Sequence, residues 1–196
     1  MPIPLKPFAD FLNEARSGTL YHGSPYEFTQ FSLKKVGSGD GNKKFGYGLY
    51  FVDNEETAQL YARDLSFSDK HKITGFNIYE VRITGLDRFY EWTTPLPLDV
   101  IEQVCELLRR KRKGKSANEL WAENDPDNGY DPFNLDSLHS WLSYALGESQ
   151  PKASALLFEA GVYGARVEQD FIHEGIVYVA FSDTIVRIVD HYKLDR

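Results

Sequence analysis

Cysteine is almost absent from this sequence of 196 residues, since Cys105 is the only one. A single cysteine cannot form a disulfide within the chain, which fits a reducing compartment. No stretch approaches the roughly 18 consecutive apolar residues of a membrane span. The opening MPIPLKPFADFL lacks the charged segment and long apolar run of a secretory signal. We therefore expect a protein of the cytoplasm, or one delivered into the cytoplasm of a target cell, with no membrane partner.

Positive charge is also scarce, because 22 Lys and Arg face 29 Asp and Glu, for a net charge of −7. This balance argues against a dedicated nucleic-acid binder. The five histidines are scattered and the cysteine lies in the apolar run VIEQVCELL. That run predicts a buried Cys105 rather than a nucleophile, and the spacing predicts no metal site.

What the sequence does contain is the composition of a globular domain, with 42% hydrophobic and 26% charged residues. We interpret residues 1–196 as one domain. Periodicity predicts helices over 7–18 and 54–65, with Asn54 as the cap of the second, and a helical stretch over about 98–160. The predicted strands are 19–23, 47–53, 73–84, 161–167, 175–181 and 184–190, and 86–97 is expected to be a loop. This order predicts an α+β fold with a split β-sheet core and a helical insertion.

Two short glycine-containing motifs suggest a ligand site. In LYHGS (20–24), the ring nitrogens of His22 can bind a ligand by hydrogen bonds. Gly23 leaves its backbone N–H and C=O groups accessible to the same ligand because it has no Cβ. In GYGLYFVD (46–53), Gly48 permits close approach of a ligand to the backbone, and Tyr50 points away from the face of its two apolar neighbours. Tyr61 follows eleven residues later on the predicted helix, where it can stack on a flat ring or belong to the core.

Together these motifs resemble the ADP-ribosyltransferase superfamily, in the His-Tyr-Glu branch that includes diphtheria toxin and the poly(ADP-ribose) polymerases. The segments HGSPYEFTQF, GYGLYFVDNEETAQLYA, LDRFYEW, ASALLFEAGVYGAR and YVAFSD are most similar to bacterial and phage ADP-ribosyltransferase-like domains. The resemblance extends over about residues 19–190. It implies that the co-substrate is NAD and that no metal takes part.

The resemblance also assigns positions around NAD. It implies that His22 holds the ribose next to nicotinamide, that the Gly23 backbone binds the nicotinamide amide, and that Tyr50 and Tyr61 sandwich the ring. Ser24 and the glycine-rich loop 36–46 would lie toward the rest of the dinucleotide. His22 and Tyr50 are therefore expected to line one crevice.

The third member of the triad is less clearly marked in HEGIVYVAFSD (173–183). One alignment of the family's final strand places Glu174 in the position of the catalytic glutamate, and the other places Val177 there. We choose Glu174 as the catalytic acid, with Glu168 as a weaker substitute. The polymerases also have a serine where this chain has Ala58, so one hydrogen bond to the nicotinamide amide would be lost, worth about 1 kcal/mol.

The predicted function is NAD-dependent mono-ADP-ribosyl transfer to a protein or nucleic acid, in a bacterial toxin, an effector or a phage-defence factor. The alternatives are an inactive module that binds NAD or ADP-ribose, and an NAD glycohydrolase. The basic run RRKRKGK, Arg109–Lys115, either contacts the phosphates of an RNA or DNA acceptor or is a solvated helix end. An antitoxin or immunity protein is the expected neutralising partner.

Overall fold

The computed structural model describes residues 18–37, 44–66, 75–111, 134–169 and 175–195. The described residues form one seven-stranded sheet and four α-helices. The strands are β1 (Thr19–Ser24), β2 (Leu49–Val52), β3 (Gly75–Ile83), β4 (Phe89–Glu91), β5 (Gly164–Gln169), β6 (Gly175–Ala180) and β7 (Val186–Asp195). The helices are α2 (Glu55–Ser66), α3 (Leu98–Lys111), α5 (Leu135–Ala145) and α6 (Gln150–Glu159). Three short 3-10 helices are η1 (Leu33–Lys35), η2 (Leu86–Arg88) and η3 (Asp183–Ile185).

The strands follow the order β4-β5-β6-β2-β1-β3-β7, and only β4 and β5 run parallel. β1 pairs with β3 along its whole length, from Thr19 to Ser24. Its pairing with β2 is confined to one position in the described chain, where Tyr21 faces Val52. No further ladder pairing joins β1 to β2 in the described chain, so the two strands part where the His22-Gly23-Ser24 motif begins.

Each face of the sheet carries its own apolar cluster, because side chains alternate along a strand. Leu49 and Phe51 of β2 belong to one cluster, which also contains Phe31 and Tyr79, and we call this side the Phe51 face. Val52 of β2 belongs to the other cluster, on the side covered by α2, which we call the α2 face. The predicted alternation of the residues around Tyr50 is confirmed, since Tyr50 packs on the α2 face.

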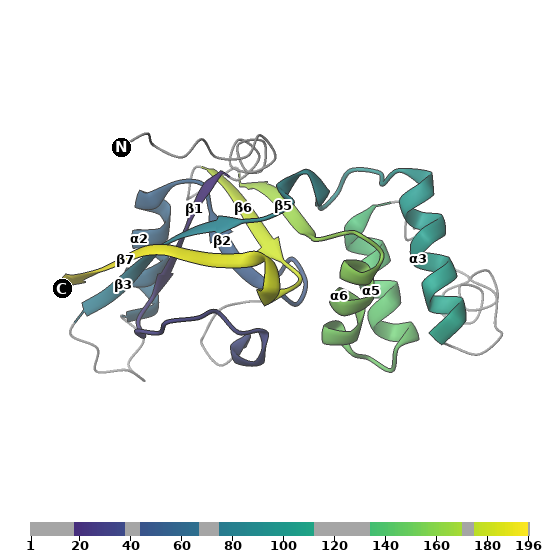
Figure 1. Cartoon of the computed structure of the whole chain (residues 1–196), viewed down its shortest axis with the longest axis horizontal. Coiled ribbons are helices and arrows are strands. Elements are labelled where there is room, and N and C mark those ends of the chain that lie inside the picture. The colour runs from purple at the N-terminus through teal and green to yellow at the C-terminus, as the bar shows by residue number, and fades with distance from the viewer. Residues whose placement is uncertain (1–17, 38–43, 67–74, 112–133, 170–174, 196) are drawn as a thin grey trace, which may run out of the picture.

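The three remaining helices lie between β4 and β5 in the chain and form a separate half of the molecule beside the sheet (Figure 1). α6 contacts both α3 and α5. Their buried residues, such as Leu108, Leu142 and Leu157, belong to the same cluster as Val177 and Val179 of the sheet. The mixed architecture therefore agrees with the predicted α+β class, with its helices between strands.

Local signals explain most of the elements, with one clear exception. The Asn54 side chain accepts hydrogen bonds from the backbone N–H groups of Glu56 (2.8 Å) and Thr57 (3.3 Å), as predicted for the cap of α2. The predicted loop 86–97 is wrong in part, because Phe89–Glu91 forms β4. This strand has three residues and depends on pairing with the distant β5, which local periodicity does not reveal. The predicted helix 7–18 lies outside the described residues except for Gly18.

Candidate functional site

His22 is tied to the neighbouring strand by its side chain. Its Nδ1 lies 2.8 Å from the backbone oxygen of Tyr50. A carbonyl oxygen only accepts, so Nδ1 carries the hydrogen and Nε2 keeps a lone pair when the ring is neutral. Burial lowers the pKa of His22, which favours that neutral form near pH 7. The bond thus fixes a tautomer whose remaining nitrogen can accept a hydrogen bond.

The His22 ring lies on the Phe51 face, among aromatic side chains. Its centroid is 5.1 Å from that of Phe31, 5.9 Å from that of Phe51 and 6.4 Å from that of Tyr79. Tyr50 packs on the α2 face instead. The two side chains therefore leave the sheet on opposite faces, which differs from the prediction that both line one crevice. A ligand that touches both would have to pass along the edge where β1 and β2 part.

Gly23 allows α2 to pack directly against β1. A Cβ on Gly23 would lie 2.1 Å from the backbone oxygen of Ala58 and 2.7 Å from Cβ of Ala62. Real Cβ atoms do not approach so closely, so only glycine fits here. The need for glycine is thus explained by helix packing, and Gly23 places Ala58, the predicted departure from the polymerase serine, beside the motif.

The Tyr50 hydroxyl is held by the segment that precedes its own strand. It donates to the backbone oxygen of Gly46 (2.9 Å) and accepts from the backbone N–H of Phe45 (3.0 Å). Burial raises the pKa of Tyr50 to about 12, so the phenol is neutral at physiological pH. Tyr61, on α2, packs against the same apolar cluster as Tyr50. The structure therefore brings Gly23, Tyr50 and Tyr61 to one face and His22 to the other.

Two other predicted ligand residues have structural contacts of their own. A Cβ on Gly48 would lie 2.6 Å from both the backbone oxygen of Ala180 and Cγ1 of Val179, so this glycine packs against β6. Ser24 is buried, and its Oγ accepts a hydrogen bond from the backbone N–H of Tyr26 (3.1 Å). Gly48 therefore leaves no open space for a ligand where its side chain would be, toward β6.

Asn77 is a residue of this region that sequence reasoning missed. It lies on β3 directly across from Ser24, and it is 4% exposed. Its buried Oδ1 has no hydrogen-bond partner among the described residues. A polar residue within a strand-like run, GFNIYEV, gave no signal that distinguished it from an exposed strand position.

The predicted acid, Glu174, lies outside the described residues, as does part of the loop 36–46. The alternative position, Val177, is a buried apolar residue of β6 that faces Val52 across the strand pair. Glu168 is exposed on β5, opposite Ile176. β6 itself therefore supplies no carboxylate, and Glu174, which immediately precedes it, is the nearest acid in sequence.

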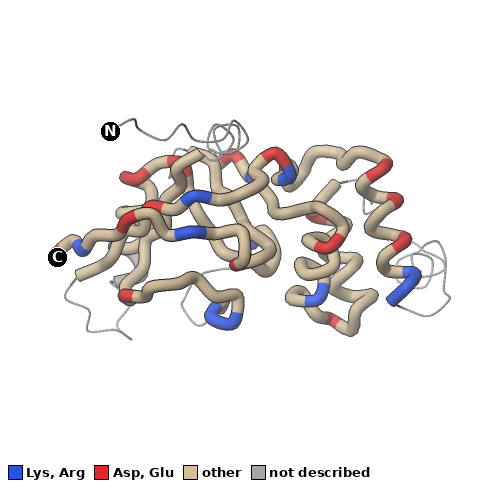
Figure 2. Tube along the Cα trace, in the orientation of Figure 1, with Lys and Arg blue, Asp and Glu red and all other residues tan. Residues whose placement is uncertain are grey.

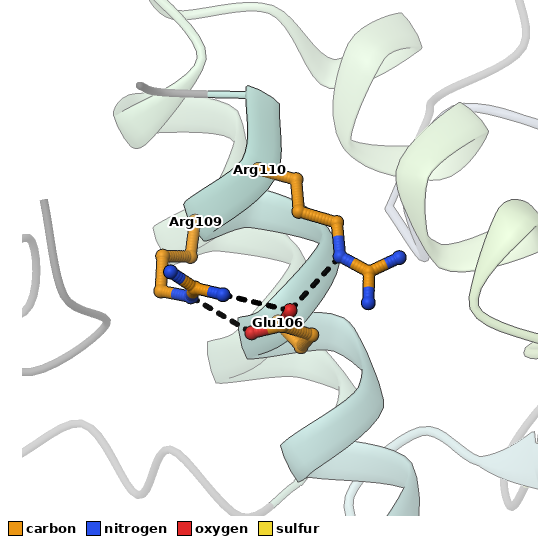
Figure 3. Close-up of polar contacts among 3 residues, drawn as sticks. All are labelled: Glu106, Arg109 and Arg110. Carbon is orange, nitrogen blue, oxygen red and sulfur yellow. Dashed lines mark hydrogen bonds and ion pairs between the residues drawn. The ribbon is translucent and has the colours of Figure 1, made fainter. Parts of the chain in front are cut away.

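The part of the basic run that the structure describes forms the end of α3 (Figure 2). Glu106 accepts hydrogen bonds from Arg109 (2.8 Å) and from Arg110 (2.9 Å), as Figure 3 shows. These contacts lower the pKa of Glu106 to about 2. Lys111 forms an ion pair with Glu159 at 2.6 Å. Such contacts fit the solvated helix end better than a surface reserved for phosphates.

Three further observations concern metal ligands, membrane spans and the cysteine in the described part of the chain. It contains no cluster of three or more His, Cys, Asp or Glu side chains able to hold a metal ion. Its helices are too short or too polar to cross a bilayer. Cys105 is partly exposed rather than buried as predicted, and desolvation raises the pKa of its thiol, which disfavours the nucleophilic thiolate.

Comparisons with known proteins give one distant structural match. No family model and no curated protein matches the sequence. Among solved structures, a chain of the M. tuberculosis MbcT-MbcA toxin-antitoxin complex aligns with a TM-score of 0.39 and 11% sequence identity. The alignment covers 93% of this chain and 89% of that chain. At this TM-score the match establishes neither a shared fold nor a shared function.

Proposed function

We propose that this chain is an NAD-dependent mono-ADP-ribosyltransferase that modifies a macromolecule. One observation carries the proposal: the bond from His22 to the backbone of Tyr50 crosses the point where β1 and β2 part. It joins the two motifs that resemble the family, although 28 residues separate them. A role as a toxin, effector or defence factor, with an antitoxin partner, rests on the motif resemblance alone.

The His22 environment suits a sugar hydroxyl. The ring is neutral and its Nδ1–H is occupied, so Nε2 can accept a hydrogen bond from a ribose hydroxyl. Tyr50 and Tyr61 share the α2 face, where aromatic rings can contact the flat nicotinamide. NAD supplies the reactive bond, between its ribose and a nicotinamide that leaves as a neutral molecule. The nucleophile of the acceptor forms the new bond to that ribose carbon and gives up its proton.

A carboxylate near the ribose stabilises the positive charge that develops on the sugar. We assign this role to Glu174, the acid that immediately precedes β6. Asp53 anchors the start of that strand, because its Oδ1 accepts a hydrogen bond from the backbone N–H of Ile176 (2.8 Å). This contact links the end of β2 to the residues that follow Glu174.

The test uses substitutions that separate the two nitrogens of His22. In His22→Asn the side-chain amide nitrogen can still donate to the Tyr50 oxygen, but nothing replaces Nε2. In His22→Gln the side-chain amide takes the place of Nε2 instead, and the group that bonds the Tyr50 oxygen is lost. The protein is incubated with NAD labelled in the adenylate and with cell extract, and both nicotinamide release and labelled macromolecules are measured. We expect His22→Asn to fold and to lose transfer, and a fully active His22→Asn would refute the role given to Nε2.

The same assay decides between the proposal and its alternatives. Nicotinamide release without a labelled acceptor, in the presence of extract, would indicate an NAD glycohydrolase. Neither product, with NAD binding shown in a separate binding measurement, would indicate an inactive module, which the absence of an acid from β6 itself favours. Transfer that disappears in Glu174→Gln supports the transferase. Treatment of the labelled product with protease or nuclease then identifies the class of acceptor.

A further inference from the structure

His139 is a buried polar residue in the helical half of the molecule that the proposed mechanism does not use. It lies on α5, is 2% exposed, and its Nε2 is 3.0 Å from Oγ of Ser154 on α6. Its ring lies near two aromatic side chains, with centroids 5.8 Å from Trp92 and 5.9 Å from Phe181. Burial lowers the pKa of His139 to about 4, so the ring is neutral at physiological pH. The contacts fix both its position and its orientation.

Gly46 lies against the ring of His139. A Cβ on Gly46 would lie 3.1 Å from Nε2, 3.2 Å from Cε1 and 3.3 Å from Cδ2 of His139, so the glycine backbone rests against the ring. Gly46 also has φ +88, a conformation that other residues rarely adopt. The backbone angle favours glycine at this position, and an added Cβ would press on the His139 ring.

Gly46 connects His139 to Tyr50. Its carbonyl oxygen accepts the hydrogen bond from the Tyr50 hydroxyl, and the preceding residue, Phe45, donates to the same hydroxyl. The Phe45 ring in turn lies 6.3 Å from Trp92, which neighbours His139. The two residues that hold the Tyr50 hydroxyl thus contact His139 on α5 and Trp92, which follows β4.

We propose that His139 is a positioning residue for Tyr50, acting through the Phe45-Gly46 backbone, so that the helices between β4 and β5 set the orientation of a tyrosine in the NAD site. The inference rests on the proposed function for the role of Tyr50. An aliphatic side chain would fill the same volume. It would lack the bond to Ser154 that holds a flat ring under Gly46, so the segment would lose its fixed support.

The experiment compares His139→Ala with Ser137→Ala, a matched control. Ser137 is also buried on α5, and its Oγ bonds to Asn134, the cap of that helix. The protein carries 13C-labelled tyrosine, and the Tyr50 signal is assigned by its loss in Tyr50→Phe. We expect His139→Ala to shift the Tyr50 signal and to lower kcat/KM for NAD by about tenfold or more. Ser137→Ala should change neither.

Two further variants keep the test decisive if His139→Ala does not fold. Ser154→Ala removes the bond that orients the ring but keeps the ring, and should shift the Tyr50 signal by a smaller amount. Gly46→Ala should shift it because of the added Cβ. An unmoved Tyr50 signal in the folded variants overturns the inference. If the unaltered protein does not consume NAD, the proposed function fails, while the Tyr50 signal still decides whether His139 positions that side chain.

Discussion

Replacement of Gly23 by alanine should loosen the contact between α2 and β1. The added Cβ would lie 2.1 Å from the backbone oxygen of Ala58 and 2.7 Å from Cβ of Ala62. Carbon atoms pack at about 3.5–4.0 Å, so α2 would have to move away by more than about 1 Å. Both alanines are fully buried and one of the clashing atoms is backbone, so rotamer changes cannot relieve the strain. Overpacking costs about 1–3 kcal/mol, and we expect the upper end of that range.

Thermal unfolding followed by circular dichroism measures this cost. A loss of about 3 kcal/mol lowers the melting temperature of a domain of this size by about 6–12 °C. Gly18→Ala is the control, because its Cβ would be 3.7 Å from Cδ1 of Leu86, an ordinary contact. If Gly23→Ala and Gly18→Ala melt at the same temperature, the close packing of α2 on β1 is refuted.

Three further predictions concern stability. In the folded state the pKa of His139 is lowered from 6.5 to about 4. Burial of the neutral ring therefore contributes about 3 kcal/mol to the free energy of unfolding above pH 6.5. This contribution disappears as the pH falls toward 4, because the unfolded chain binds the proton more readily. Urea titrations at several pH values should show a weaker acid sensitivity in His139→Gln, and an unchanged pH dependence would contradict this assignment. Asn54→Ala removes the cap of α2 and should cost about 1 kcal/mol by urea denaturation, with Asn54→Asp nearly neutral. Glu106→Gln removes exposed ion pairs and should leave the melting temperature unchanged at low and high salt, whereas a large decrease would show that these pairs stabilise the fold.

Strong local signals made part of the fold predictable. Helix α2 has both a periodic apolar face and the Asn54 cap, and β3 has a long strand-like run, so both were predicted close to their observed bounds. β4 was missed because its three residues gain their stability from a partner more than 70 residues away. The division between β1 and β2 also depends on pairing, which the sequence of neither strand reveals alone.

The sequence predicted which residues belong to the candidate site better than it predicted how they are arranged. The motifs identified His22 and Tyr50, and the structure links them through a hydrogen bond. That bond goes to the backbone of Tyr50, while the side chain lies on the opposite face, an outcome that depends on how the two strands part. The contact of His139 with Gly46 joins residues 93 positions apart and has no counterpart in local sequence.

Because β4 and β5 are parallel, the helices between them also form part of the connection between these two strands. Parallel strands cannot be joined by a tight hairpin, because the chain must first return to the end of the sheet where it started. Such a crossover connection needs about a dozen residues or more. The segment from 92 to 163 makes that return. Any shortened version of this protein must therefore retain a bridge that doubles back, or the edge strand β4 would lose its only described neighbour in the sheet.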